Sequence, residues 1–274
     1  MEMKNILIPT DFSDNAHFAI NYGAAIAEKM NASITLLYAF DIPIVADQAY
    51  FEPETLATWE KDFTKTLHDL AANLVGKYPE LKVNTLARYG LPQQVILDES
   101  AGFDLIVIGS KGYGNIGEAV FGNVTSDVVQ RSKRSVLVVP PHVHYQPVKN
   151  IVLACNDEAL ISERVVSVIK EYINAFHAKL ELLNIVTEVA GPVTEAYNMV
   201  DKIKSRFENV ESSVNVVAAN KVINGINDFS DQVHAGLIAV VPDKHSVFER
   251  LFTEIHTMHI IKTTHRAVLV IPGA

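Results

Sequence analysis

The sequence predicts a tandem α/β protein in which each half is a doubly wound, mainly parallel five-stranded sheet flanked by helices. Three observations lead to this fold class. Short apolar segments alternate with longer segments of helical periodicity. The apolar segments 105–108 and 136–139 show no polar alternation, which is typical of parallel strands covered on both faces. Three segments of the first half also return in the same order in the second half.

The repeat divides the chain into two similar domains. Residues 4–8 return as 149–153, 32–37 as 178–183, and 135–140 as 267–272. A proline-rich seam separates the two copies, and its prolines cannot continue a strand ladder or a helix. We therefore expect domains at 1–140 and 148–274, joined by a linker at 141–147.

Each half is expected to alternate strands with helices. Ser13 predicts a helix N-cap, and Pro92 stands where a first helical residue would. First-half strands are expected at 5–8, 33–38, 83–88, 105–108 and 136–139, with helices near 16–30, 56–74, from Pro92, and near 124–129. Second-half strands are expected near 150–154, 179–186, 214–219, 236–241 and 267–271.

Composition excludes several classes of function. The chain has 274 residues, of which 49% are hydrophobic, and a net charge of −9. That charge disfavours nucleic acid and anionic membranes as partners. The single Cys155 excludes an internal disulfide and a cysteine-based zinc site, and it fits a reducing cytoplasm. The start of the chain lacks the pattern of a secretory signal, and no apolar run approaches the ~20 residues of a membrane helix. A cytoplasmic protein is therefore expected.

Candidate ligand-binding residues follow the first and fourth strands, because ligands of open α/β sheets bind beyond the carboxyl ends of strands. The segment 9–13 follows the first strand, and Gly109, Gly112 and Gly122 follow the fourth. Glycine permits positive φ and close approach of the backbone to phosphate, and a helix starting at 122–125 would offer free N–H groups. A flexible surface loop is the alternative interpretation.

Two better-known phosphate motifs fit this loop poorly. Residues 112–117 match the dinucleotide fingerprint G-x-G-x-x-G, but the next strand does not end in the acidic residue that would bind ribose. Gly117 and Gly122 have the spacing of a Walker A loop, but Asn123-Val124 replaces its Lys-Ser/Thr. Five histidines lie between 234 and 265 without a compact set of metal ligands, so we expect a solvated helix face there and no metal site.

With Asp11 after the first strand, the pattern Gly109-x2-Gly112-x9-Gly122 resembles the universal stress protein family, as a tandem pair of its domains. The resemblance implies an adenine nucleotide, ATP or else AMP or ADP, with Mg²⁺ as a compatible companion ion. It departs at Asn123, where the family pattern has a hydroxyl residue. It implies these positions: Pro9, Thr10 and Asp11 at the adenine and ribose end, the backbone of Ala39 at adenine, Gly109 and Gly112 at ribose and phosphate, and Gly122, Asn123, Val124 and Thr125 at the phosphates.

The second half is expected to have lost this site. Ala154, Cys155 and Asn156 replace residues 9–11, and Val241, Lys244 and Glu254 replace the three glycines. A carboxylate at a helix start repels phosphate, and a side chain fills the space that glycine leaves. One nucleotide per chain is therefore expected, with a structural or partner-facing second half.

The resemblance also implies a regulatory role in a stress response, with the nucleotide tuning conformation or the binding of an unidentified protein partner. The last strands of the two halves would pair as an internal pseudo-dimer, and a homodimer is compatible with this.

No residue is placed as a general base for hydrolysis, so we expect that the protein is not an enzyme, although slow ATP hydrolysis stays open. The alternatives are an interaction module without nucleotide, or an ATP-using enzyme of related fold such as a pyrophosphatase or an electron-transferring flavoprotein. Residues 9–13 lack the S-G-G-x-D-S loop of the pyrophosphatases.

Overall fold

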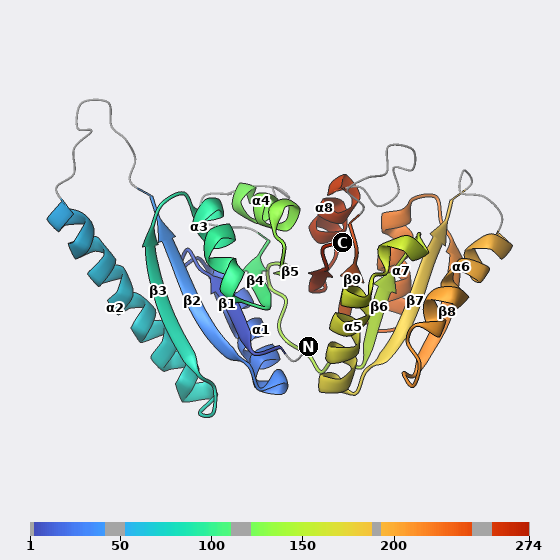
Figure 1. Ribbon diagram of the computed structural model, residues 1–274, viewed down its shortest axis with the longest axis horizontal. Coiled ribbons are helices and arrows are strands. Elements are labelled where there is room, and N and C mark those ends of the chain that lie inside the picture. Colours follow the sequence, from blue (N-terminus) through green and yellow to red (C-terminus); the bar gives the residue numbers. More distant parts are fainter. Residues whose placement is uncertain (1–2, 42–52, 111–121, 188–192, 243–253, 274) are drawn as a thin grey trace. The chain divides into compact units, whose positions relative to one another are not determined.

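The computed structural model describes residues 3–41, 53–110, 122–187, 193–242 and 254–273 (Figure 1). Contacts between Cα atoms divide the chain into two compact units, one of Met3–Val136 and one that begins at Leu137. Across the described residues, no helix combines the length and apolar character that crossing a membrane requires.

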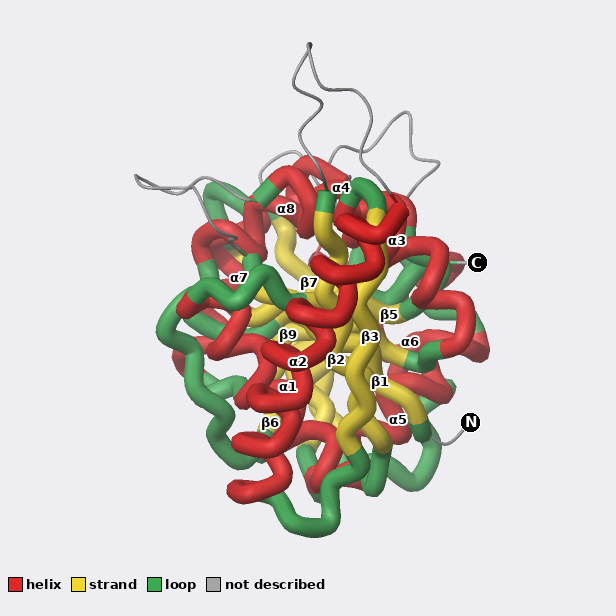
Figure 2. The backbone as a smooth tube through the Cα atoms, turned by 90° about the vertical axis from the view of Figure 1, so that its left-hand side faces the viewer, coloured by secondary structure: helices red, strands yellow, loops and turns green. Residues whose placement is uncertain are grey.

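The first unit is a parallel sheet with helices on both faces. Its strands lie in the order β3-β2-β1-β4, and each pair of neighbours is parallel. Figure 2 shows α1 and α2 on one side of these strands and α3 on the other. The elements are β1 (Asn5–Pro9), α1 (Asp14–Met30), β2 (Ser33–Phe40), α2 (Pro53–Lys77), β3 (Val83–Tyr89), α3 (Pro92–Glu99), a 3₁₀ turn (Ser100–Gly102), β4 (Leu105–Gly109), α4 (Asn123–Arg131) and β5 (Ser135–Val139), within which the two units meet in sequence.

The second unit repeats the order of these four strands in β8-β7-β6-β9, as the sequence repeat predicts, and adds β10 beside β9. Its strands lie in the order β10-β9-β6-β7-β8, again with parallel neighbours. The elements are β6 (Asn150–Ala154), a 3₁₀ turn (Glu158–Leu160), α5 (Glu163–Phe176), β7 (Lys179–Val186), α6 (Val193–Ser205), β8 (Ser212–Ala218), α7 (Val222–Gln232), β9 (Leu237–Val240), α8 (Glu254–Thr263) and β10 (Val268–Val270).

α1 packs closely against the sheet of the first unit at Gly23. A Cβ atom on Gly23 would lie 2.5 Å from Ile8 Cδ1 and 3.3 Å from Val107 Cγ1. Glycine therefore lets α1 approach β1 and β4 more closely than any other residue would. Because β4 is buried at every position, this close packing forms the centre of the first unit.

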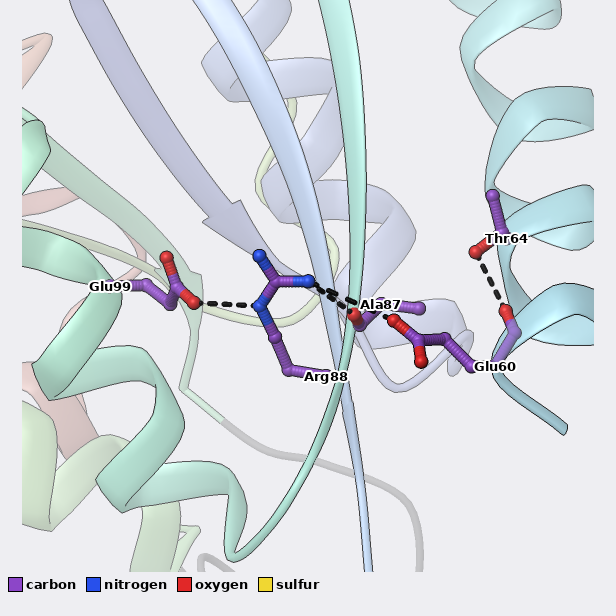
Figure 3. Close-up of polar contacts among 5 residues, drawn as sticks. All are labelled: Glu60, Thr64, Ala87, Arg88 and Glu99. Atoms are coloured by element: carbon purple, nitrogen blue, oxygen red, sulfur yellow. Dashed lines mark hydrogen bonds and ion pairs between the residues drawn. The ribbon is translucent and has the colours of Figure 1, made fainter. Parts of the chain in front are cut away.

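A pair of acidic side chains flanks the arginine at the outer strand of the first unit (Figure 3). Arg88 Nε donates to Glu99 Oε1 of α3 at 2.9 Å, and its Nη1 lies 3.8 Å from Glu60 Oε1 of α2. The same Nη1 donates to the carbonyl of Ala87 at 3.2 Å. One side chain of β3 thus links the two helices, which lie on opposite sides of the strands.

The second unit buries one carboxylate within a polar network. Glu181 on β7 accepts hydrogen bonds from Ser213 and, at 2.9 Å, from Asn215 Nδ2, and it lies 2.8 Å from Lys179 Nζ. Burial alone raises the pKa of Glu181, but the hydrogen bonds from Lys179, Ser213 and Asn215 outweigh burial and hold the pKa below its ordinary value. The folded state therefore favours the ionised form of the Glu181 carboxyl group.

Candidate functional site

The turn after β1 begins as an extension of the sheet. The Thr10 N–H donates to the carbonyl of Leu37 at 2.8 Å, which continues the β1–β2 ladder one residue past Pro9. The Thr10 hydroxyl is buried and accepts the N–H of Phe12 at 3.0 Å. Thr10 therefore shapes the turn through both its backbone and its side chain.

Asp11 and Ser13 together start α1. Asp11 Oδ1 accepts the Ser13 N–H at 3.0 Å and the Ser13 hydroxyl at 2.6 Å. Ser13 Oγ in turn accepts the Ala16 N–H at 3.2 Å, so the predicted N-cap at Ser13 is confirmed. Asp11 is not itself the cap; it orients the hydroxyl that is.

The backbone of Ala39 faces the end of β1. Residues of a parallel strand bond alternately to the two neighbouring strands, and on β2 the carbonyl of Leu37 bonds toward β1 whereas that of Phe40 bonds toward the β3 side. Ala39 therefore directs its N–H and C=O to the β1 side, beyond the last β1–β2 pair at Pro9. This leaves amide donor and acceptor groups beside the turn at residues 9–13, at the position predicted for adenine.

An aromatic cluster that was not predicted from the sequence lies at the same end of β2. Its members are the rings of Phe12, Tyr38, Phe40, Phe63 and Tyr89. The Phe12 and Tyr38 centroids are 4.6 Å apart, and Tyr38 meets Phe63 of α2 edge-on at 4.7 Å. Burial, and then the charge of Asp11, raise the pKa of Tyr38. The alternation of Tyr38 and Phe40 along β2 was the available signal.

The end of β4 is joined to the start of α4 by two hydrogen bonds. Thr125 is only 3% exposed, and its Oγ1 donates a hydrogen bond to the Gly109 carbonyl at 2.8 Å. The Gly122 N–H donates to the carbonyl of Ser110 at 3.1 Å. The hydroxyl proton of Thr125 therefore secures the strand end.

The first turn of α4 has no side-chain cap among the described residues. Its N-cap residue is Gly122, and the first backbone hydrogen bond of the helix runs from the Ser126 N–H to the Gly122 carbonyl. The N–H groups of residues 123–125 thus precede that bond. Gly122 has φ −64° and ψ 132°, so the positive φ expected for this glycine is not found. Its close approach to phosphate stays a prediction.

Adjacent strands bring most predicted site residues to one edge of the sheet. β1 and β4 are parallel neighbours, with Ile6 opposite Leu105 and Leu7 opposite Ile106. The turn after β1 and the β4–α4 junction therefore leave the sheet side by side. Of the predicted set, Pro9, Thr10, Asp11, Ala39, Gly109 and 122–125 come to this edge, and Gly112 lies outside the described residues.

The corresponding edge of the second unit is built differently. The Cys155 N–H donates to Leu183 at 2.9 Å, as Thr10 does to Leu37, but the amide of Asn184 occupies the place of Tyr38 and donates to the Cys155 carbonyl at 2.8 Å. Asp157, the counterpart of Phe12, has φ −147°. Burial raises the pKa of the Cys155 thiol to about 12. Lys244 and the side chain of Glu254 lie outside the described residues.

Two buried polar atoms of the second unit lack the partners of their first-unit counterparts. Thr257 corresponds to Thr125, yet its hydroxyl has no hydrogen-bond partner among the described residues. Asn156 corresponds to Asp11, and its Oδ1 is likewise unpaired within the described part of the chain. As for metals, the described residues contain no group of three or more His, Cys, Asp or Glu side chains that could hold an ion.

A model of the universal stress protein family matches residues 2–140, half of the chain. The chain belongs to this family. A universal stress protein of Methanocaldococcus jannaschii is 28% identical over 152 residues, which cover 50% of this chain and 94% of that protein.

Solved structures match the fold over almost the entire chain. A universal stress protein from Archaeoglobus fulgidus has a TM-score of 0.76 at 17% identity and covers 98% of this chain and 96% of its own. A functionally unknown protein from Pseudomonas aeruginosa has a TM-score of 0.64 at 13% identity, covering 99% and 93%. These likenesses support the tandem α/β fold predicted from the sequence.

Proposed function

We propose that this universal stress protein binds one adenine nucleotide, with ATP as the principal ligand and AMP or ADP as alternatives, at the carboxyl edge of its first unit. The observation that carries the proposal is the start of α4. It has no side-chain cap among the described residues, and it is tied to the end of β4 beside the turn after β1. A helix N-terminus attracts phosphate through its N–H groups and its dipole.

The nucleoside and the phosphates of the ligand bind at different parts of this edge. The backbone of Ala39 presents amide groups to the base, and the Asp11 carboxylate accepts donors from the nucleoside. Pro9 and Thr10 line that end, and Gly109 and Gly112 approach the ribose and the first phosphate. The N–H groups of Asn123, Val124 and Thr125, with Gly122 before them, bind the phosphates, and Mg²⁺ would accompany these phosphates.

The role of the nucleotide is regulatory. We infer a cytoplasmic stress-response protein whose bound nucleotide tunes its conformation or its affinity for a protein partner. The second unit, without the glycine set, serves as a structural or partner-facing copy. Catalysis is not part of this proposal.

The test is calorimetric titration of the full chain with ATP, supported by mass spectrometry of ligand released from freshly purified protein. Gly122→Val should weaken ATP binding at least about tenfold, or roughly 1.4 kcal/mol. Gly76→Val is the matched control, because a Cβ at Gly76 meets nothing within 4 Å. Unchanged affinity in a folded Gly122→Val protein would overturn the phosphate assignment, and absence of binding to the wild type would favour the nucleotide-free interaction module.

A further inference from the structure

Phe12 adopts a backbone conformation that large side chains rarely hold. Its φ is +62°, in the left-handed region that favours glycine. Such conformations persist only where the surroundings determine them, and they concentrate at functional sites. Phe12 lies between Asp11 and Ser13, at the centre of the turn that leads into α1.

Contacts on both sides of Phe12 hold this conformation. Its N–H is bound by the Thr10 hydroxyl at 3.0 Å, within the same turn. Its ring lies 4.6 Å from that of Tyr38 on β2, and Tyr38 is backed by Phe63 of α2 at 4.7 Å. The turn is therefore anchored through one aromatic pair to a strand and a helix that are distant in sequence.

The left-handed residue sets the direction of Asp11. By reversing the chain at Phe12, it returns the Ser13 N–H and hydroxyl to Asp11 Oδ1, at 3.0 and 2.6 Å. Asp11 is thereby held close enough to Tyr38 for its charge to act on the phenol. Four consecutive residues and one strand residue thus form a single arrangement around the carboxylate.

The second unit provides an internal comparison within the same fold. Its residue at the place of Phe12 is Asp157, with an extended φ of −147°, and its residue at the place of Tyr38 is Asn184. The left-handed turn and the aromatic pair are both missing where the three glycines and the aspartate are also missing. The left-handed turn and the aromatic pair therefore occur in the unit that has the predicted site residues, and the α/β fold itself does not require them.

We propose that the Phe12–Tyr38 ring pair positions the nucleoside end of the site: it holds the left-handed turn and so fixes the direction of the Asp11 carboxylate. The inference rests on the proposed function and deepens it. Phe12 and Tyr38 are positioning residues, because they act through Asp11. Their effect is on the nucleoside, so adenosine, AMP and ATP are all sensitive to it.

The experiment measures the affinity of the full chain for adenosine, AMP and ATP by calorimetry, together with the melting temperature. Phe12→Leu and Tyr38→Leu should each weaken all three ligands by a similar factor, about tenfold. The double variant should lose little more, because the rings act as a unit. Tyr38→Phe keeps the ring and should retain the affinity. Phe12→Gly, which accepts the left-handed φ without strain, should lose affinity without a matching loss of melting temperature.

Phe176→Leu is the matched control, since Phe176 belongs to an aromatic pair with Tyr172 in the second unit, 5.9 Å apart. It should change stability but no ligand affinity. Unchanged affinities in folded Phe12→Leu and Tyr38→Leu proteins would overturn the positioning role while leaving nucleotide binding in place. A wild-type protein that binds none of the three ligands would instead overturn the proposed function and this inference with it.

Discussion

Replacing Thr125 by valine should destabilise the fold, whereas the same substitution at the corresponding Thr257 should leave stability unchanged or raise it. Thr125→Val removes a hydroxyl that donates to the Gly109 carbonyl at 2.8 Å from a residue that is 3% exposed. Thr257 is 2% exposed, and its hydroxyl has no hydrogen-bond partner among the described residues. Thr257→Val removes this unpaired hydroxyl. Valine is close to threonine in shape, so the two changes differ mainly in the hydrogen bond.

The magnitudes follow from the state of each hydroxyl. At Thr125 the change leaves a buried carbonyl without its donor, which costs about 1–3 kcal/mol. A loss of about 2 kcal/mol corresponds to a fall of roughly 4–8 °C in melting temperature. At Thr257 the change removes a polar group that is buried at a cost, so stability should stay the same or rise by up to about 1–2 kcal/mol.

Differential scanning calorimetry of the two single variants and the wild type measures these shifts, and ATP titration follows the site. Thr125→Val should also weaken ATP binding, because the hydrogen bond holds α4 against the end of β4. Thr257→Val should leave ATP binding unchanged. Equal destabilisation by the two variants, or a more stable Thr125→Val protein, would refute the reasoning.

Three further outcomes are expected. Since the pKa of Glu181 is held below its ordinary value of 4.5, its carboxylate stabilises the fold above that pH and loses the contribution as the pH falls further. The difference in unfolding midpoint between wild type and Glu181→Gln should therefore be large at pH 7 and shrink toward pH 3; a constant difference would contradict this. Cys155, buried and with a pKa near 12, should resist a thiol reagent at pH 8 until guanidinium unfolds the protein, so rapid labelling of the native chain would be the contrary result. Arg88→Gln should cost less than about 1 kcal/mol in denaturant titration, because the arginine side chain is 45% exposed; a loss of several kcal/mol would contradict that estimate.

Local signals were enough to predict most of the fold. Hydrophobic periodicity and the repeat predicted the parallel strands, and Ser13 and Pro92 marked helix starts because their effects operate within one turn of the chain. The carboxyl-edge rule placed residues 9–11 and 122–125 together because β1 and β4 are neighbours. The predicted pairing of the two last strands and the domain limits at 140 and 148 stay predictions.

The finer features of the candidate site depend on contacts between distant segments. The aromatic cluster joins the turn after β1 to β2, α2 and β3, so no window of sequence contains it. The left-handed φ of Phe12 cannot be predicted from the residue type, since phenylalanine rarely adopts this conformation. The sequence also does not show that the Thr125 hydroxyl reaches the Gly109 carbonyl, while the placement of Thr125 at the phosphates stays a prediction.

The most direct test of the account is the stoichiometry of ATP binding to the full chain. Calorimetry should give close to one ATP per chain for the wild type and for Gly76→Val, with strongly weakened binding for Gly122→Val. This result would follow from a site formed by the turn after β1 and the start of α4. Two equivalent sites per chain, or one site whose affinity is indifferent to Gly122→Val, would contradict it.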